Sequence, residues 1–138
     1  MEAYCVYVGA DGTSKIGRVT LPMMAKIIGE DGASTWTNVQ TGRTWGVTGG
    51  EGHLPTDDFG PWHTAGNPMM SIVLQGAWEV QAGSGERRVL ELGSLTIFLD
   101  DTGPGHRSRT VSIEPSIVIG VGLDEKSALD FKTQLGII

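Results

Sequence analysis

The chain has 138 residues, which is enough for one domain that buries most of its apolar surface, and we expect a single domain over residues 1–138. Its formal net charge of −6 argues against nucleic acid and anionic membrane surfaces as partners, because both require a basic face. No apolar run approaches the roughly 20 residues that cross a bilayer, the first residues lack a signal-peptide pattern, and Cys5 is the only cysteine, so we expect a cytoplasmic protein without an intrachain disulfide.

The first half of the chain predicts short strands separated by turn-forming residues. Segments rich in β-branched and aromatic residues are typical of strands, and they lie at 4–8, 16–21, 25–28, 34–39 and 42–48. The last two segments flank the turn-forming residues Gln40-Thr41-Gly42 and predict a hairpin.

The second half predicts further strands and one terminal helix. The segments 69–74 and 77–82 predict a second hairpin across Gln75-Gly76, and further strands are expected at 86–92, 94–99, 110–113 and 116–123. Only the tail is helical in pattern, with Asp124 as its N-cap and Gly136 at its end. Many short strands without helices between them favour an all-β barrel or sandwich over a βαβ fold.

His63 opens the segment "WHTAGNPMMSIVLQGAWEV" (62–80), in which Ala65, Met69 and Gly76 stand at motif-like spacing. The spacing resembles the first motif of the cupin family. That motif is a His-x-His pair, an acid four or five residues later, and a Gly seven beyond the acid. The resemblance places His63 on the first histidine, Ala65 on the second, Met69 on the acid and Gly76 on the glycine.

The segment "ERRVLELGSLTIFLDDTGPGHRSR" (86–109) continues the same pattern, because Gly93 opens a strand and a Pro/Gly-rich turn leads to His106. It is similar to the second cupin motif. The Trp-His pair and the Asp-Thr-Gly-x-Gly-His turn also resemble those of a group of small single-domain cupins. The resemblance covers residues 59–109 and implies an all-β, cupin-type jelly-roll barrel or sandwich, here with a short C-terminal helix.

The resemblance also implies a metal site that this chain fills only in part. A complete cupin site has three imidazoles and one carboxylate, which suit Fe, Mn, Ni or Zn. Here His63 and His106 match two of the histidines, while an Ala and a Met occupy the other two positions. Two imidazoles hold a divalent ion poorly, so we expect no cofactor. The alternative is a metal held by His63, His106 and His53, with a carboxylate of the loop around His53 as the fourth ligand.

Without a metal, His63 and His106 are candidates for acid/base catalysis, because imidazole is the side chain that ordinarily titrates near neutral pH. Asp100 and Asp101 lie just before His106 in the chain and can orient an imidazole, and of the two we expect Asp101 to do so. Such a His-Asp pair resembles the one in metal-free sugar epimerases built on the same barrel. The alternative remains that His106 and Asp101 are turn residues whose side chains bond the backbone.

Side-chain alternation predicts which residues face a pocket. If Met69 faces inward, Ser71 and Val73 share its face, while Met70, Ile72 and Leu74 form an apolar face that the helix or a partner subunit must cover. Trp62 lies next to His63 in the chain and is expected at the pocket mouth. The complete set of expected substrate-binding residues is Trp36, Trp45, His53, Trp62, Met69 and Ser71.

Together these patterns predict an enzyme that performs non-oxidative acid/base chemistry on a small, fairly apolar molecule, as in secondary metabolism. The reaction is expected to be that of an isomerase, cyclase, dehydratase or decarboxylase. The expected partners are this substrate and a second copy of the chain, since small cupins are commonly dimers; neither nucleic acid nor a membrane is expected. Two alternatives remain open: a metal-dependent, dioxygenase-like cupin and a non-catalytic cupin that binds a small ligand.

Overall fold

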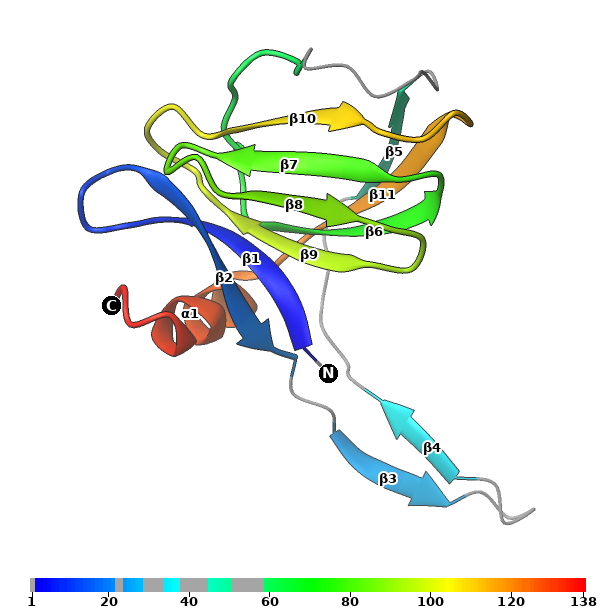
Figure 1. The fold of residues 1–138 in the computed structure, drawn as a ribbon. Helices are drawn as coiled ribbons and strands as arrows, with labels where there is room; N and C mark the ends of the chain where they lie inside the picture. Colours follow the sequence, from blue (N-terminus) through cyan, green and yellow to red (C-terminus); the bar gives the residue numbers. More distant parts are fainter. Residues whose placement is uncertain (1, 22–23, 29–33, 38–44, 51–58) are drawn as a thin grey trace.

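The computed structural model describes residues 2–21, 24–28, 34–37, 45–50 and 59–138. This part of the chain contains eleven strands and one helix (Figure 1). Their bounds are β1 Glu2–Val8, β2 Ser14–Thr20, β3 Met24–Ile28, β4 Ser34–Thr37, β5 Trp45–Gly50, β6 Met69–Gln75, β7 Trp78–Ala82, β8 Arg87–Leu90, β9 Leu95–Leu99, β10 His106–Thr110, β11 Ser116–Gly122 and α1 Glu125–Gln134. Within these ranges, no helix has the length and apolar character needed to cross a membrane.

Nine of the described strands form two sheets. The larger sheet has the order β2-β1-β9-β6-β11-β5, and the smaller has the order β10-β7-β8. His63 adds an isolated antiparallel bridge to His106, so its segment lies at the free edge of β10. A jelly roll has two facing four-stranded sheets. Here β5, β11, β6 and β9 form one of them, and the His63 segment, β10, β7 and β8 form the other. β1 and β2 extend the first sheet beyond β9. The predicted all-β jelly roll with a C-terminal helix is therefore confirmed.

One apolar cluster lies between the two sheets and joins their inner faces. It contains Val6, Ile16, Val73, Val80, Ala82, Leu90, Phe98 and Val118. Along β6, Val73 belongs to this cluster while Met70 packs against a different one, which confirms the alternation predicted for this strand. Leu74 is 48% exposed on the outer side of β6, and the homodimer that would cover such surface remains a prediction.

A second apolar cluster lies on the outer face of the larger sheet, beneath α1. Ile97 and Leu99 of β9 pack there with Ala128 and Phe131 of the helix. The helix begins as predicted, because the side chain of Asp124 accepts a hydrogen bond from the Ser127 backbone N–H at 2.7 Å. Gly136 follows its end in the left-handed conformation, with φ 71°. Because β9 is buried on both faces, its sequence is apolar almost throughout.

The predicted hairpin across Gln75-Gly76 is wrong. β6 pairs with β9 and β11, whereas β7 pairs with β8 and β10, so the chain crosses from one sheet to the other at this turn. Gly76 has φ 68°, and a Cβ there would lie 2.6 Å from Ser112 Oγ. A glycine turn between two apolar segments has the local pattern of a hairpin. Here, however, β6 and β7 lie in opposite sheets, and each buries its apolar face in the interior between them.

The predicted pairing of 34–39 with 42–48 is also wrong. β4 pairs with β3, and together they form a separate two-stranded sheet that stands away from the others in Figure 1. β5 pairs instead with β11. The strand expected at 110–113 lies earlier in the chain, as β10 at His106–Thr110. The reason is that β10 starts to pair with β7 at His106, opposite Ala82, directly after the Pro/Gly-rich turn.

Candidate functional site

A cavity of about 370 Å³ lies between the two sheets and contains both motif histidines. Its lining comes from β5, β6, β7, β9, β10 and β11 and from the segment after the His63 bridge. The lining residues are Gly46, His63, Thr64, Ala65, Asn67, Pro68, Met69, Ser71, Trp78, Phe98, His106, Val118, Gly120 and Gly122. None of these is Lys, Arg, Asp or Glu, so the described lining is mainly apolar apart from the two imidazoles and a few uncharged polar groups.

His106 is the first residue of β10, and its imidazole is held by a buried carboxylate. Its Nδ1 lies 2.6 Å from Oδ2 of Asp100, and the two residues are 4% and 0% exposed. An ionised carboxylate accepts only, so Nδ1 carries the hydrogen and donates it. The other nitrogen, Nε2, lies on the opposite edge of the ring and keeps its lone pair in the neutral form.

The carboxylate that contacts His106 is therefore that of Asp100, which corrects the choice of Asp101. Asp100 follows β9 and continues the alternation that turns Thr96 and Phe98 to the interior. Asp101 points the other way: it is exposed, and its carboxylate lies 3.8 Å from Lys132 Nζ. Extending the alternation of the strand by one residue would have identified the correct acid from the sequence.

His63 lies next to His106 although the two are far apart in the sequence. Their backbones exchange two hydrogen bonds of 2.9 Å, and their ring centroids are 4.5 Å apart with the planes tilted by 60°. His63 Nδ1 lies 3.0 Å from the carbonyl oxygen of Pro61, which can only accept, so this nitrogen also carries the hydrogen. Gly105 permits the close approach, because it has φ 77° and a Cβ there would collide with the His63 carbonyl.

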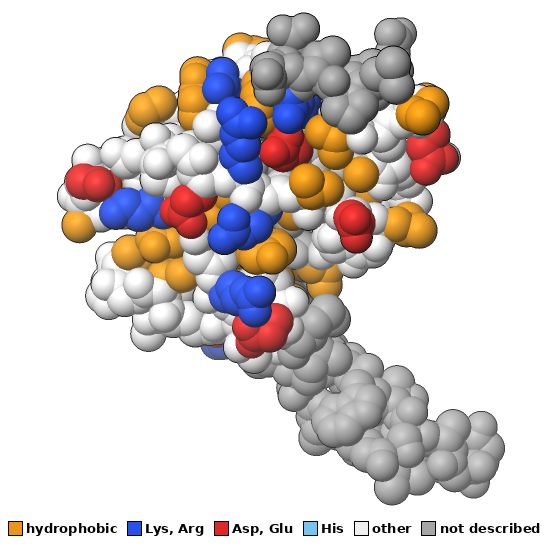
Figure 2. All heavy atoms as spheres, in the orientation of Figure 1, with side chains coloured by type: hydrophobic (Ala, Val, Ile, Leu, Met, Phe, Trp, Pro, Cys, Tyr) orange, Lys and Arg blue, Asp and Glu red, His pale blue; other side chains and the backbone are white. Residues whose placement is uncertain are grey.

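The segment 59–65 is fastened to the edge and outer face of the smaller sheet and to the residue that follows β9 of the larger sheet. Gly60 N–H donates to the Ser108 carbonyl at 2.9 Å, and Ala65 N–H donates to the Asp100 carbonyl at 3.1 Å. The Phe59 ring meets three guanidinium groups at 4.4 to 5.0 Å, those of Arg87, Arg107 and Arg109. Basic side chains with an acidic one among them are visible on this side of the molecule in Figure 2. These contacts position His63.

Trp62 does not lie where it was expected. Its ring stacks on the Arg107 guanidinium at 4.9 Å, it is 42% exposed, and it is not part of the described cavity lining. The cause is the strand-like path of the segment, in which neighbouring side chains point to opposite sides: His63 turns inward and Trp62 turns to the arginines. The tryptophan that does line the cavity is Trp78, which the alternation of β7 turns toward the interior.

The remaining predicted residues are only partly brought together. Met69 and Ser71 line the cavity. Trp45 belongs to β5, where it lies opposite Val121 and next to the lining residue Gly46, and Trp36 belongs to β4, in the separate sheet. His53 lies outside the described residues. Asp100, Phe98 and Trp78 were absent from the predicted site.

The four positions matched to cupin metal ligands all line one cavity, as that match requires: His63, Ala65, Met69 and His106. Their donor set is two imidazoles and a thioether. Among the described residues, no three His, Cys, Asp or Glu side chains are grouped so as to hold a metal ion. Within the described residues, two imidazoles without a carboxylate fall short of the three or more protein ligands that Fe, Mn, Ni or Zn take; His53 and the acids of its loop, the alternative ligands, lie outside the described residues.

The Asp100 carboxylate also affects Cys5, on β1. Burial, reinforced by the negative charge of Asp100, raises the pKa of the Cys5 thiol. A thiolate, the reactive form, is thereby disfavoured. Cys5 is fully buried in the cluster beneath α1, so we assign it to the core and not to the site.

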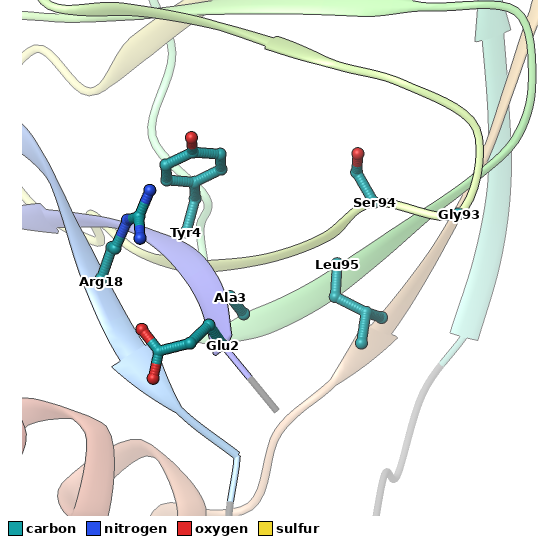
Figure 3. Close-up of a pocket in the computed structure, with 7 residues that line it drawn as sticks. All are labelled: Glu2, Ala3, Tyr4, Arg18, Gly93, Ser94 and Leu95. Carbon is teal, nitrogen blue, oxygen red and sulfur yellow. The ribbon is translucent and has the colours of Figure 1, made fainter.

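A smaller hollow of about 280 Å³ lies at the other end of the larger sheet (Figure 3). Its charged groups are already engaged: the Arg18 guanidinium lies 5.5 Å from the centre of the Tyr4 ring, and Glu2 accepts a hydrogen bond from the Thr20 hydroxyl at 2.7 Å. Neither a histidine nor a buried carboxylate is among its described lining residues. The cavity between the sheets is therefore the better candidate for a functional site.

The fold and the cavity define a jelly-roll protein with a buried His-Asp pair. No family model matches the sequence, and no curated protein matches it. Among solved structures, the chain is similar to the cupin domain of Cnp3 from Schizosaccharomyces pombe. The two are 14% identical with a TM-score of 0.40, over 98% of this chain and 93% of that chain. A similarity this distant says nothing about function, and the jelly-roll architecture follows from the order of the strands alone.

Proposed function

We propose that the protein is a small-molecule enzyme that performs non-oxidative acid/base chemistry in the cavity between its sheets. The observation that carries this proposal is the hydrogen bond of 2.6 Å between His106 and Asp100 at the cavity wall, with both residues buried. A carboxylate that holds an imidazole in one tautomer and orientation is the arrangement by which enzymes prepare histidine for proton transfer.

The two histidines supply two proton carriers on the same cavity. In each ring Nδ1 is engaged, by the Asp100 carboxylate or by the Pro61 carbonyl, and Nε2 is left as the proton-accepting atom. A two-base isomerisation uses one neutral imidazole to remove a proton and a second, protonated imidazole to return one, and a ring separation of 4.5 Å lets both imidazoles reach one small molecule.

The lining supports a small and mainly apolar substrate. Met69, Trp78, Phe98 and Val118 supply apolar side chains to it, and no charged side chain lies among the described lining residues. A volume of about 370 Å³ lies at the lower end of the range usual for ligand sites. The isomerase, cyclase, dehydratase and decarboxylase reactions all remain compatible with this site.

The experiment uses the cell's own small molecules, because the substrate is not identified. The purified protein is incubated in D₂O with a small-molecule extract of the producing cells, and compounds are followed by mass spectrometry. Proton transfer at carbon makes a product gain deuterium in whole mass units. We expect the His106→Gln variant to lower this rate by roughly 10²- to 10⁴-fold, because an amide cannot carry the proton.

Matched controls separate catalysis from other roles. Asp101→Asn changes an exposed acid next to Asp100 and is expected to keep the wild-type rate, whereas Asp100→Asn is expected to lose most of it. Retention of most of the rate by both His63→Gln and His106→Gln would refute the proposal. A compound that native mass spectrometry finds bound, but that the protein never alters, would instead support a non-catalytic binding protein.

A further inference from the structure

Four residues lie side by side across the inner face of the larger sheet, and we call them the floor row: Thr96, Ser71, Gly120 and Gly46. The strand register places each opposite the next across β9, β6, β11 and β5. Ser71 and the two glycines line the cavity. The floor row therefore presents two hydroxyl groups beside two positions that have no side chain.

Both hydroxyl groups of the floor row are buried without a partner. Ser71 is 2% exposed and Thr96 is 1% exposed, and within the described part of the chain neither hydroxyl makes a hydrogen bond. Other buried hydroxyls of this protein are satisfied, as in the 2.7 Å bond between Thr110 and Ser116. Burying a hydroxyl without a partner is costly and therefore uncommon, so two of them on one sheet face beside a cavity point to a ligand.

The glycines of the floor row leave space next to these hydroxyls. A Cβ at Gly120, directly opposite Ser71, would lie 2.5 Å from Met69 Cε, and a Cβ at Gly46 would meet nothing within 4 Å. Any side chain at position 120 would therefore take up space beside Ser71. The open volume of the cavity extends to Ser71, with Thr96 directly opposite Ser71 on β9, because two of the four floor positions are glycine.

We propose that the floor row binds an uncharged oxygen atom of the ligand, and that the ligand class is a small, mainly apolar carbonyl compound. Ser71 and Thr96 can each donate one hydrogen bond, and a carbonyl oxygen has two lone pairs to accept them. A carboxylate or phosphate would find no Lys or Arg among the described lining residues. This inference rests on the cavity being the ligand site of the proposed function, but not on the ligand being converted.

The test compares three probes of similar size that differ at one group: acetophenone, ethylbenzene and benzoate. Their dissociation constants are measured by NMR titration with the wild type, with Ser71→Ala and with Thr96→Val. Ser127→Ala is the control, because Ser127 is a buried serine on α1, away from the cavity. We expect the wild type to bind acetophenone about three- to tenfold more tightly than ethylbenzene, with benzoate weakest.

Removal of either floor hydroxyl is expected to abolish the preference for acetophenone and to leave the affinity for ethylbenzene unchanged, while Ser127→Ala keeps the preference. The melting temperatures of Ser71→Ala and Thr96→Val are expected to equal or exceed that of the wild type, because each change removes a hydroxyl that lacks a partner. A fall of several degrees in both would overturn the inference by showing that the hydroxyls are bonded within the fold.

Two binding outcomes distinguish this inference from the proposed function. If ethylbenzene binds as tightly as acetophenone, the carbonyl assignment is wrong while the cavity remains a ligand site. If no probe binds and the extract experiment in D₂O shows no turnover, the proposed function fails together with the inference.

Discussion

The contact between Asp100 and His106 allows one prediction to be worked out from the structure. The perturbation is a set of three variants, Asp100→Ala, His106→Ala and the double variant, which together isolate the coupling between the two side chains. Their atoms lie 2.6 Å apart, and the side chains are 0% and 5% exposed, so neither water nor salt screens the interaction. The structure thus predicts a strong coupling.

A hydrogen bond with a charged partner contributes about 1.5–3 kcal/mol, and a buried group left without its partner adds a desolvation cost to each single variant. Asp100 Oδ1 has no partner among the described residues, so removing Asp100 also removes one unsatisfied acceptor. We therefore expect Asp100→Ala to cost about 2 kcal/mol of unfolding free energy. The double variant is expected to cost about 1.5–3 kcal/mol less than the sum of the two single variants.

The assay is urea unfolding followed by tryptophan fluorescence, with the free energy extrapolated to water. The control is Asp101→Ala, whose ion pair with Lys132 is partly exposed and 3.8 Å long, and which is expected to cost less than about 0.5 kcal/mol. The reasoning is refuted if the two single effects add within about 0.5 kcal/mol, or if Asp101→Ala costs as much as Asp100→Ala.

Two further predictions concern the metal positions and the buried thiol. Ala65→His combined with Met69→Glu completes the ligand set on the cavity wall. We expect this double variant to retain one equivalent of nickel or zinc through gel filtration, whereas the wild type retains a substoichiometric amount. Elemental analysis measures the metal content of both proteins. Cys5 is expected to react with a thiol reagent such as DTNB only after unfolding, because burial raises its pKa, and fast labelling of the native protein would contradict this. Above the ordinary cysteine pKa of about 8.5, the Cys5 thiol ionises in the unfolded chain but not in the folded protein. The unfolding free energy therefore falls as the pH rises through this range, and Cys5→Ala is expected to remove this dependence.

The strands and the helix were largely evident from local patterns. Alternation along β6 predicted the inward face that carries Met69 and Ser71, and this is the face that lines the cavity. The cap at Asp124 and the glycine at position 136 predicted both ends of α1. These features depend on backbone conformation and side-chain direction over a few residues, which the local sequence dictates.

Strand pairing and the composition of the site were decided only by the tertiary structure. The hairpin expected at Gly76 is a crossing between sheets, and no local pattern distinguishes the two, because partner strands are selected by the burial of apolar faces that are distant in sequence. The bridge between His63 and His106 and the turning of Trp62 to Arg107 follow from that pairing, whereas the choice of Asp100 over Asp101 was already contained in the alternation of β9. The sequence by itself determined which histidines stand at motif positions, whereas the jelly-roll register determined which side chains meet them.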